Sequence, residues 1–367
     1  MGQFVHLHVH SHFSKLDGLS SLGGLIKKAV ADGMPALALT DHGNMFGAKE
    51  FSNAIAKHNK GVKGAVADAQ KALDEAEQGG DEEAIAAARE ALEAAKARRL
   101  KPILGCEMYV AQRDMHEHLD KKDTGRHLVV LAKNAVGYHN LIKLVSRAWT
   151  EGFYSHPRTD KASLAAHHEG LIVCSACLGG EIPRLLLNGD VEGAEEAVKW
   201  WKSVFGDDYY IELQRHKANV PHANHDTYEL QRSIEDKLID IARRNGVKII
   251  ATNDVHFVDE ADAEAHDLLI CLATNKYRND PNRMLYSKQE WMKTRGEMWE
   301  LFGDIPEALE NTLEIANKVE EYSIEHEPIM PNFAIPEEFG TEEEYRSRLT
   351  EEDLFNEFTR DEHGNKV

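Results

Sequence analysis

The sequence is poor in cysteine, in long apolar runs and in basic charge, and each scarcity excludes a class of protein. Four cysteines in 367 residues are too few for a disulfide-stabilised secreted fold, so we expect a reducing, cytoplasmic location. No apolar run approaches the roughly 20 residues that span a bilayer, and the start of the chain has no cationic segment followed by an apolar one, the pattern of a secretory signal. We therefore expect no membrane partner.

Basic residues are outnumbered by acidic ones, 43 against 63, which leaves a formal net charge of −20. A protein that grips nucleic acid over its whole surface carries the opposite balance. The acidic excess is uneven, because Asp304–Val367 holds 19 acidic and 5 basic residues. The body of the chain is only mildly acidic and has room for a local anion site.

Short β-like runs alternate with helical patterns through most of the chain. The expected strands are Phe4–His8, Ala36–Thr40, Pro102–Val110, His127–Ala132, Leu171–Ser175, Tyr209–Leu213 and Val247–Thr252. Helical patterns such as Leu22–Asp32, Asn44–Asn59, Ala135–Thr150, Val191–Phe205 and Thr227–Asn245 separate most of them. This alternation predicts βαβ units and a largely parallel sheet. Seven units of this size favour an α/β fold closed as a barrel over an open sheet.

Two parts of the chain depart from this alternation. Lys60–Arg99 is built from strong helix formers, with small apolar side chains at steps of three and four on both sides of Gly79-Gly80. It predicts an antiparallel helical hairpin, inserted at 60–100, whose narrow apolar seam closes on itself. Past Ala263 the strand pattern ends and helical patterns follow. We therefore assign 1–275 to the barrel domain and 276–367 to a helical C-terminal extension with an acidic tail.

Histidine is abundant, with 20 residues, and His6-Leu7-His8-Val9-His10 is the densest cluster. On a strand, its three histidines share one face while Leu7 and Val9 share the other. Imidazoles placed side by side repel each other when they are charged, whereas a metal ion uses them as neutral ligands. This segment alone leaves a metal role and a chance pattern about equally open.

Further potential ligands recur at the strand boundaries, mostly at carboxyl ends, where functional groups of α/β barrels lie. They are Asp17 in Leu16-Asp17-Gly18, His42 in Thr40-Asp41-His42-Gly43, Glu107 in Gly105-Cys106-Glu107, His127, Cys177, and Asp254 and His256 in Asn253-Asp254-Val255-His256. The recurrence predicts that these side chains converge. Simpler interpretations remain for single members: Asp17 as a turn residue, Cys177 as an inert buried thiol. Asp41 is expected to orient His42 from outside the ligand set.

These motifs resemble the PHP (polymerase and histidinol phosphatase) domain and, more narrowly, the PHP domain at the N-terminus of bacterial DNA polymerase III alpha subunits. The segment from Met284-Leu285-Tyr286-Ser287 to Ile305–Thr312 is similar to the stretch that links that domain to the polymerase core. The resemblance covers Phe4 to Pro331, apart from the predicted hairpin, to which it assigns no role. The chain is then expected to be a piece of a longer polymerase. By itself, this piece is not expected to polymerise DNA.

The resemblance implies a distorted (βα)7 barrel with a trinuclear metal cluster. The family's nine ligand positions fall on His8, His10, Asp17, His42, Glu107, His127, Cys177, Asp254 and His256. Asp17, Glu107 and Asp254 would act in catalysis as ligands of water-activating metals. The mixed nitrogen, oxygen and sulfur donors favour three zinc or manganese ions, with iron or magnesium as alternatives. The implied activity is a 3′–5′ exonuclease that proofreads the primer 3′ end of DNA.

Two arginines, Arg158 and Arg215, are candidates for clamping the substrate phosphate, with ordinary surface roles as the simpler interpretation. The implied partners are the rest of the polymerase chain and other replisome subunits. Two other functions stay open. One is a stand-alone phosphatase of small phosphomonoesters, and the other is a non-catalytic domain that stabilises the polymerase and its partners.

Overall fold

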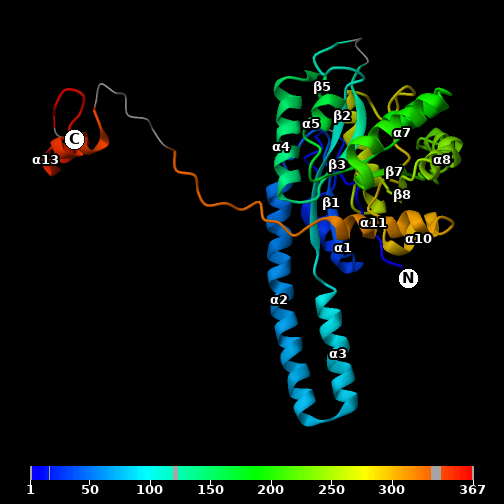
Figure 1. Ribbon diagram of the computed structural model, residues 1–367, viewed down its shortest axis with the longest axis horizontal. Helices are drawn as coiled ribbons and strands as arrows, with labels where there is room; N and C mark the ends of the chain where they lie inside the picture. The colour runs from blue at the N-terminus through cyan, green and yellow to red at the C-terminus, as the bar shows by residue number, and fades with distance from the viewer. Residues whose placement is uncertain (1, 16, 119–122, 332–339, 366–367) are drawn as a thin grey trace. The chain divides into compact units, whose positions relative to one another are not determined.

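The computed structural model describes residues 2–15, 17–118, 123–331 and 340–365 (Figure 1). Leu16 of the expected Leu16-Asp17-Gly18 motif, and parts of the acidic tail, lie outside these residues. The chain forms two compact units, Met1–Ile324 and Glu325–Val367. Within the described residues, no helix combines the length and the apolar character needed to cross a membrane.

An eight-stranded mixed sheet forms the centre of the first unit. Its main strands lie in the order β1 (Ala36–Leu39), β2 (Lys101–Val110), β3 (Arg126–Ala132), β6 (Leu171–Cys174), β7 (Tyr209–Leu213) and β8 (Lys248–Ala251). The short strands β5 (His156–Thr159) and β4 (Phe153–Tyr154) extend the sheet beside the end of β2. The six main strands fall where the sequence predicted strands.

The N-terminal segment closes this sheet into a distorted barrel. On one side, the amides of Ala38 and Thr40 donate to the carbonyls of His6 and Val9, at 3.0 and 2.8 Å. On the other side, the segment exchanges hydrogen bonds with Val255, beyond the end of β8. The expected strand Phe4–His8 is therefore an extended segment that pairs through isolated bridges. With it, seven chain segments surround the barrel axis.

The main strands are largely parallel, as the sequence predicted, except for β3, which runs antiparallel to both of its neighbours, β2 and β6. The described part of the β2–β3 connection holds no helix, and antiparallel strands do not need the helical crossover that parallel strands require. As a consequence, the amino end of β3 lies at the same rim of the barrel as the carboxyl ends of β1 and β2.

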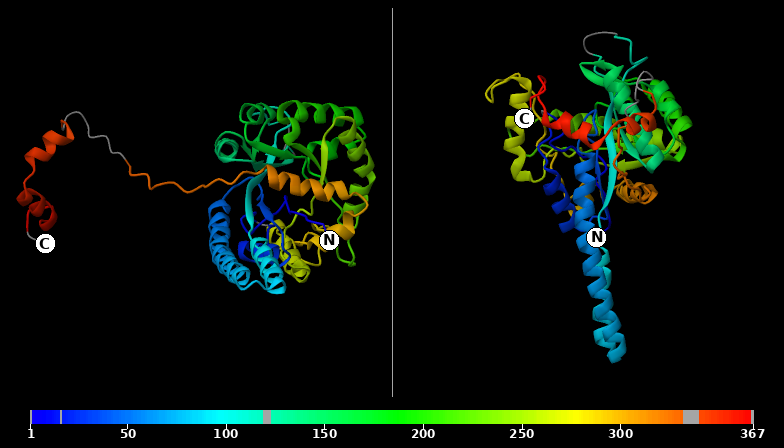
Figure 2. Two further views of the ribbon diagram at one scale, coloured as in Figure 1. Left: turned by 60° about the horizontal axis from the view of Figure 1, so that its bottom comes forward. Right: turned by 90° about the vertical axis from the view of Figure 1, so that its left-hand side faces the viewer.

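Helices surround the barrel (Figure 2). In chain order they are α1 (Leu22–Ala31), α4 (Ala135–Thr150), α5 (Lys161–Ala166), α6 (Glu181–Leu187), α7 (Val191–Phe205), α8 (Asp226–Arg244), α9 (Ala263–Thr274), α10 (Arg295–Phe302) and α11 (Pro306–Lys318). Apolar side chains alternate along β3: Leu128 and Val130 pack outwards under the helices, whereas Val129 and Leu131 fill the barrel. The first unit includes α10 and α11, which lie in the segment that the sequence analysis assigned to the extension.

The predicted hairpin is present as α2 (Ala48–Gly79) and α3 (Glu82–Lys96), which project from the barrel (Figure 1). Its first arm is continuous with the helix expected at Asn44–Asn59. Gly61 and Gly64 lie at the junction, but each costs a helix only about 1 kcal/mol, and no proline interrupts it. Val62, Leu73 and Leu92 are buried along the hairpin, and Gly80 ends α2 in the left-handed conformation. The second unit holds α12 (Glu342–Arg348) and α13 (Glu351–Thr359), each started by a capping box.

Candidate metal centre

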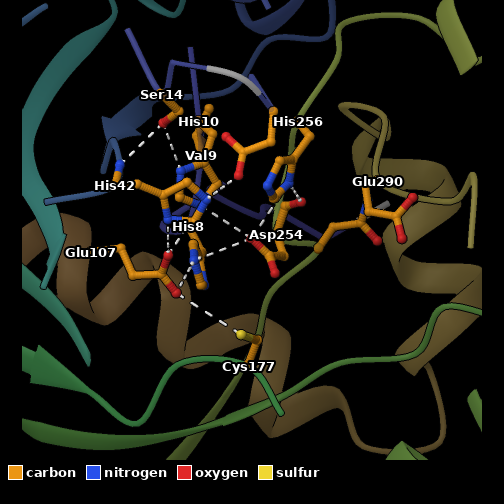
Figure 3. Close-up of polar contacts among 12 residues, drawn as sticks. His8, Val9, His10, Ser14, His42, Glu107, Cys177, Asp254, His256 and Glu290 are labelled. Carbon is orange, nitrogen blue, oxygen red and sulfur yellow. Dashed lines mark hydrogen bonds and ion pairs between the residues drawn. The ribbon is translucent and has the colours of Figure 1, made fainter. Parts of the chain in front are cut away.

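One rim of the barrel collects all nine predicted ligand side chains. Figure 3 labels His8, His10, His42, Glu107, Cys177, Asp254 and His256 among them. His8 and His10 project from the N-terminal segment, Glu107 from β2, and His127 from the amino end of β3. The other five lie in loops next to strands or after the N-terminal segment: Asp17, His42, Cys177, Asp254 and His256. Because β3 is antiparallel, His127 reaches the rim from the start of its strand.

Glu107 is the centre of the cluster and is only 1% exposed. Its Oε1 lies 3.3 Å from His8 Nε2, 2.8 Å from His127 Nδ1 and 3.9 Å from Cys177 Sγ. Its Oε2 lies 2.5 Å from His42 Nδ1 and 3.7 Å from His10 Nε2. The two oxygens thus face different sets of donors, which is the arrangement of a carboxylate that bridges two cations.

Two further carboxylates flank this centre. Asp254 Oδ1 lies 3.2 Å from His8 Nε2 and 3.1 Å from His10 Nε2. The backbone of Asp254 has a φ of +47°, a conformation that is strained for a residue with a side chain and that persists mainly at functional sites. Asp17 Oδ2 lies 3.1 Å from His42 Nε2. Carboxylates therefore stand on both sides of the imidazole cluster.

The donor atoms form three overlapping groups, within each of which the potential ligand atoms lie within 4.8 Å of one another. The groups are His10, His42 and His256; His8, His10 and Glu107; and Glu107, His127 and Cys177. In addition, seven buried ligand atoms face one another without forming a hydrogen bond of normal geometry among the described residues: His8 Nε2, His10 Nε2, Asp17 Oδ1, His42 Nδ1, Glu107 Oε2, Asp254 Oδ1 and His256 Nε2. Buried polar atoms rarely stay unpaired, so these residues fit a site that holds several metal ions.

Opposite charges perturb the titration of the cluster. Burial by itself would raise the pKa of Glu107, but His127, His42 and His8 hold it well below its usual range. The pKa of His42 rises well above its usual value because Asp17 and Glu107 outweigh the effect of burial. His10 shows the reverse shift: burial, together with His42 and His256, lowers its pKa to about 3. The carboxylates of the cluster therefore stay ionised, the form in which they bind cations.

Cys177 needs a cation to act as a thiolate ligand. Burial, Asp254 and Glu107 raise the pKa of its thiol well above the usual value. Its Sγ lies 3.5 Å from His127 Nδ1, so a metal at that position would contact both side chains and would favour loss of the thiol proton.

Buried polar residues orient the two histidines of the N-terminal segment. His8 Nδ1 lies 3.0 Å from Glu212 Oε2 in β7, and the other oxygen of Glu212 accepts the amide of Ala176 at 2.9 Å. His10 Nδ1 lies 3.0 Å from Ser14 Oγ, which donates to Asp41 Oδ1 at 2.7 Å. Asp41 thus acts on His10 through Ser14, and the expectation that it orients the His42 ring is wrong. We did not predict Glu212, although a carboxylate inside an apolar strand was a usable signal.

The two arginines proposed as phosphate clamps are engaged elsewhere. Arg158 is fully buried, and its guanidinium donates to Asp123 Oδ2 at 2.7 Å and to the carbonyl of Met115 at 2.9 Å. Arg215 donates to Glu235 and Asp304, at 2.6 Å in each case. Since both guanidinium groups are held in ion pairs and neither lines the cavity at the metal centre, we do not retain the clamp role for them.

A cavity of about 360 Å³ opens beside the cluster. On one side it is lined by His42, His127, Cys177, Asp254 and His256, and its other side includes Arg184, His216, Tyr286 and Glu290. His266 of α9, also outside the predicted set, donates from Nε2 to the backbone carbonyl of Asp17 at 2.8 Å. The rim therefore combines potential metal ligands with space for a substrate.

Comparisons with known proteins agree with this site. The model of the PHP domain family matches residues 6–216, which include seven of the nine cluster residues. The DNA polymerase III subunit alpha of Borreliella burgdorferi is 39% identical over 358 residues, covering 96% of this chain and 27% of that protein. The subunit of Treponema pallidum is 37% identical over 359 residues, covering 97% and 26%. The chain thus spans about a quarter of the length of these relatives, and it belongs to the PHP domain family.

Proposed function

We propose that this chain is the metal-dependent phosphodiesterase module of a replicative DNA polymerase and that it removes nucleotides from the 3′ end of DNA. The observation that carries this proposal is Glu107, whose two buried oxygens face separate groups of imidazole and thiol donors. Paired cations that share a carboxylate are a recurring arrangement in phosphoryl-transfer enzymes. The mixed donor set favours zinc or manganese over magnesium.

The residues of the rim have distinct tasks in this proposal. Glu107, Asp17 and Asp254 hold and partly neutralise the cations, with the five histidines and Cys177 completing the ligand sets. Bound metals would lower the pKa of water towards neutrality and stabilise charge on the phosphoryl oxygens. Glu212 and the pair formed by Ser14 and Asp41 keep the rings of His8 and His10 in place, as outer partners of metal ligands commonly do.

The substrate and the partners follow from the relatives. They are named as alpha subunits of DNA polymerase III, so the primer 3′ end is the substrate that we propose, with proofreading as the purpose. The partners that we propose are the remainder of a longer polymerase chain and other replisome subunits. Similarity along nearly the whole chain to much longer polymerases counts against a stand-alone phosphatase.

A nuclease assay with the purified chain tests the proposal. Metal-free protein should not shorten a primer labelled at its 5′ end and mismatched at its 3′ end, and added manganese or zinc should restore shortening from the 3′ end. Asp254→Asn should abolish the activity, whereas Asp240→Asn on the exposed face of α8 should not change it. Elemental analysis that finds metal without any cleavage would instead favour a structural role for the domain.

A further inference from the structure

A second cavity, of about 130 Å³, adjoins the metal centre on the outer side of β3. It lies among β3, α5, α6 and α7, and His127 is part of its lining. Arg184 of α6 lines both this cavity and the larger one beside the cluster. The two spaces therefore meet at Arg184, within reach of anything bound at the metal centre.

The charge of this cavity is positive, although the chain as a whole carries −20. Its lining includes three cationic residues, Arg126, Lys161 and Arg184, and one acidic residue, Glu181. Glu181 is fully engaged: its Oε1 accepts Lys161 Nζ at 2.7 Å and its Oε2 accepts Trp201 Nε1 at 2.8 Å. The lysine and the glutamate offset each other, so the excess charge comes from the two arginines.

Neither arginine side chain has a polar partner among the described residues. Arg184 is exposed and Arg126 is partly buried. Arg158 and Arg215 show the opposite situation, since acidic residues neutralise both of them. An uncompensated pair of guanidinium groups is suited to bind a phosphate, because the planar donor fork matches the geometry of phosphate oxygens.

The cavity borders a packed aromatic cluster, which favours a binding site over a gap between loose side chains. Lys161 Nζ lies over the rings of Trp200 and Trp201, 4.8 and 5.4 Å from their centroids. Trp201 is only 1% exposed and stacks on Tyr209 of β7. Next to the cavity, the amide of His127 donates to the carbonyl of Gly179, which ties the start of β3 to the turn before α6.

We propose that Arg126 and Arg184 bind the phosphodiester group of a single DNA strand adjacent to the group that is cleaved. The inference rests on the proposed nuclease function and adds the residues that would hold the strand. A strand with its terminal linkage at the metal centre would have its next phosphate beside this cavity, because the two cavities share His127 and Arg184. Both are positioning residues, because they contact the substrate away from the reacting atoms.

Binding of a fluorescent oligo(dT) to the 367-residue chain tests this, measured by anisotropy in EDTA at several salt concentrations. We expect Arg184→Gln and Arg126→Gln each to weaken binding about tenfold, equivalent to roughly 1.4 kcal/mol. Each should also reduce the slope of log K against log salt by about 0.7, the value for one lost phosphate contact on a single strand. Arg184→Lys should keep the slope and lose only part of the affinity. Arg98→Gln, an exposed arginine of the hairpin region, is the matched control and should change neither.

The same variants separate this inference from the proposed nuclease. If the metal-loaded chain cleaves no DNA but the binding differences appear, the nuclease proposal fails and the cavity assignment stands. Slopes unchanged in both glutamine variants, or no measurable binding by the unsubstituted chain, overturn the assignment. Inorganic phosphate that displaces the oligonucleotide at equal concentration of phosphate groups also overturns it, since the cavity would then prefer a free phosphate to a strand.

Discussion

The metal-centre rim and the α2–α3 hairpin differ in the sequence distance between the residues that stabilise them. The hairpin uses neighbours in the sequence, strong helix formers and a seam of a few apolar side chains. The rim is assembled from separate segments, and His8 alone contacts carboxylates at positions 107, 212 and 254. Local structure of the first kind follows from propensity, whereas the rim exists only when the whole barrel is closed.

The largest effect should come from the carboxylate at the centre of the rim. Glu107→Gln keeps the size of the side chain but removes the charge that faces His42 and His127, and breaking a buried charge cluster typically costs about 3–5 kcal/mol. We expect loss of bound metal, a drop in cleavage larger than the roughly 10–100-fold typical of losing an outer partner of a metal ligand, and a lower free energy of unfolding. Elemental analysis, the primer assay and urea denaturation measure the three quantities. Full metal content in this variant would contradict the central position of Glu107.

A smaller loss of metal affinity is expected from changing Glu212, which contacts the metal ligand His8. Glu212→Gln removes the negative partner of His8 Nδ1, and loss of such outer partners usually lowers metal affinity by about 10–100-fold. Competition with a fluorescent chelator measures this affinity. Glu307→Gln, an exposed carboxylate of α11 paired with Arg243, serves as the control. Equal metal affinity in both variants would show that Glu212 only fills space.

Buried charge near the barrel should also make stability depend on pH. Lys293 is 3% exposed, and burial lowers its pKa from the usual 10.5 to about 7. Between these values the unfolded chain binds a proton that the folded chain does not, so stability rises with pH from about 7 to 10.5, by up to about 1.4 kcal/mol per pH unit.

Lys293→Met should remove this contribution and raise stability at pH 7. Urea denaturation at pH 7, 8 and 9 gives the slope for both proteins, and Lys63→Met on the exposed hairpin is the control that keeps the original slope. Parallel pH dependence in Lys293→Met and the unsubstituted chain would argue that Lys293 does not titrate in this range.

The smallest effect should follow from shortening the hairpin. Asn59 closes its base by exchanging hydrogen bonds with the backbone of Leu100, at 2.8 and 3.0 Å. Replacement of residues 61–98 by a short Gly/Ser linker that keeps both residues should leave metal content unchanged and shift the melting temperature by only a few degrees. Differential scanning calorimetry and elemental analysis check this. A collapse of metal binding would show that the hairpin supports the rim after all.

The sequence predicted the local features of the fold better than the long-range ones. The six main strands and helices such as α4 and α7 were predicted because their apolar periodicity is complete within each segment. The direction of β3 was not predicted, since it depends on which strands pair. Helices α5 and α6 were missed because six or seven residues hold too little periodicity.

The same difference applies to the site. The ligand set could be predicted because its motifs are dense and match a known pattern. Which arginines form ion pairs with acidic residues could not be predicted. The sequence left Arg158 and Arg215 as candidates for binding phosphate, but in the structure Asp123 and Glu235 form ion pairs with them. Arg126 and Arg184 carry no sequence motif, and their interest comes entirely from the absence of neutralising neighbours in the described structure.

The bridging N-terminal segment has a consequence for synthesis. Val9 pairs with Val255. The N-terminal segment that carries His8 and His10 therefore emerges from the ribosome long before the segment around Val255 with which it pairs. Until the region after β8 has been translated, this stretch has only one of its two neighbours, and contacts between such distant positions form slowly. Nascent chains should therefore gain the ability to retain metal abruptly, once residues near 256 have left the exit tunnel.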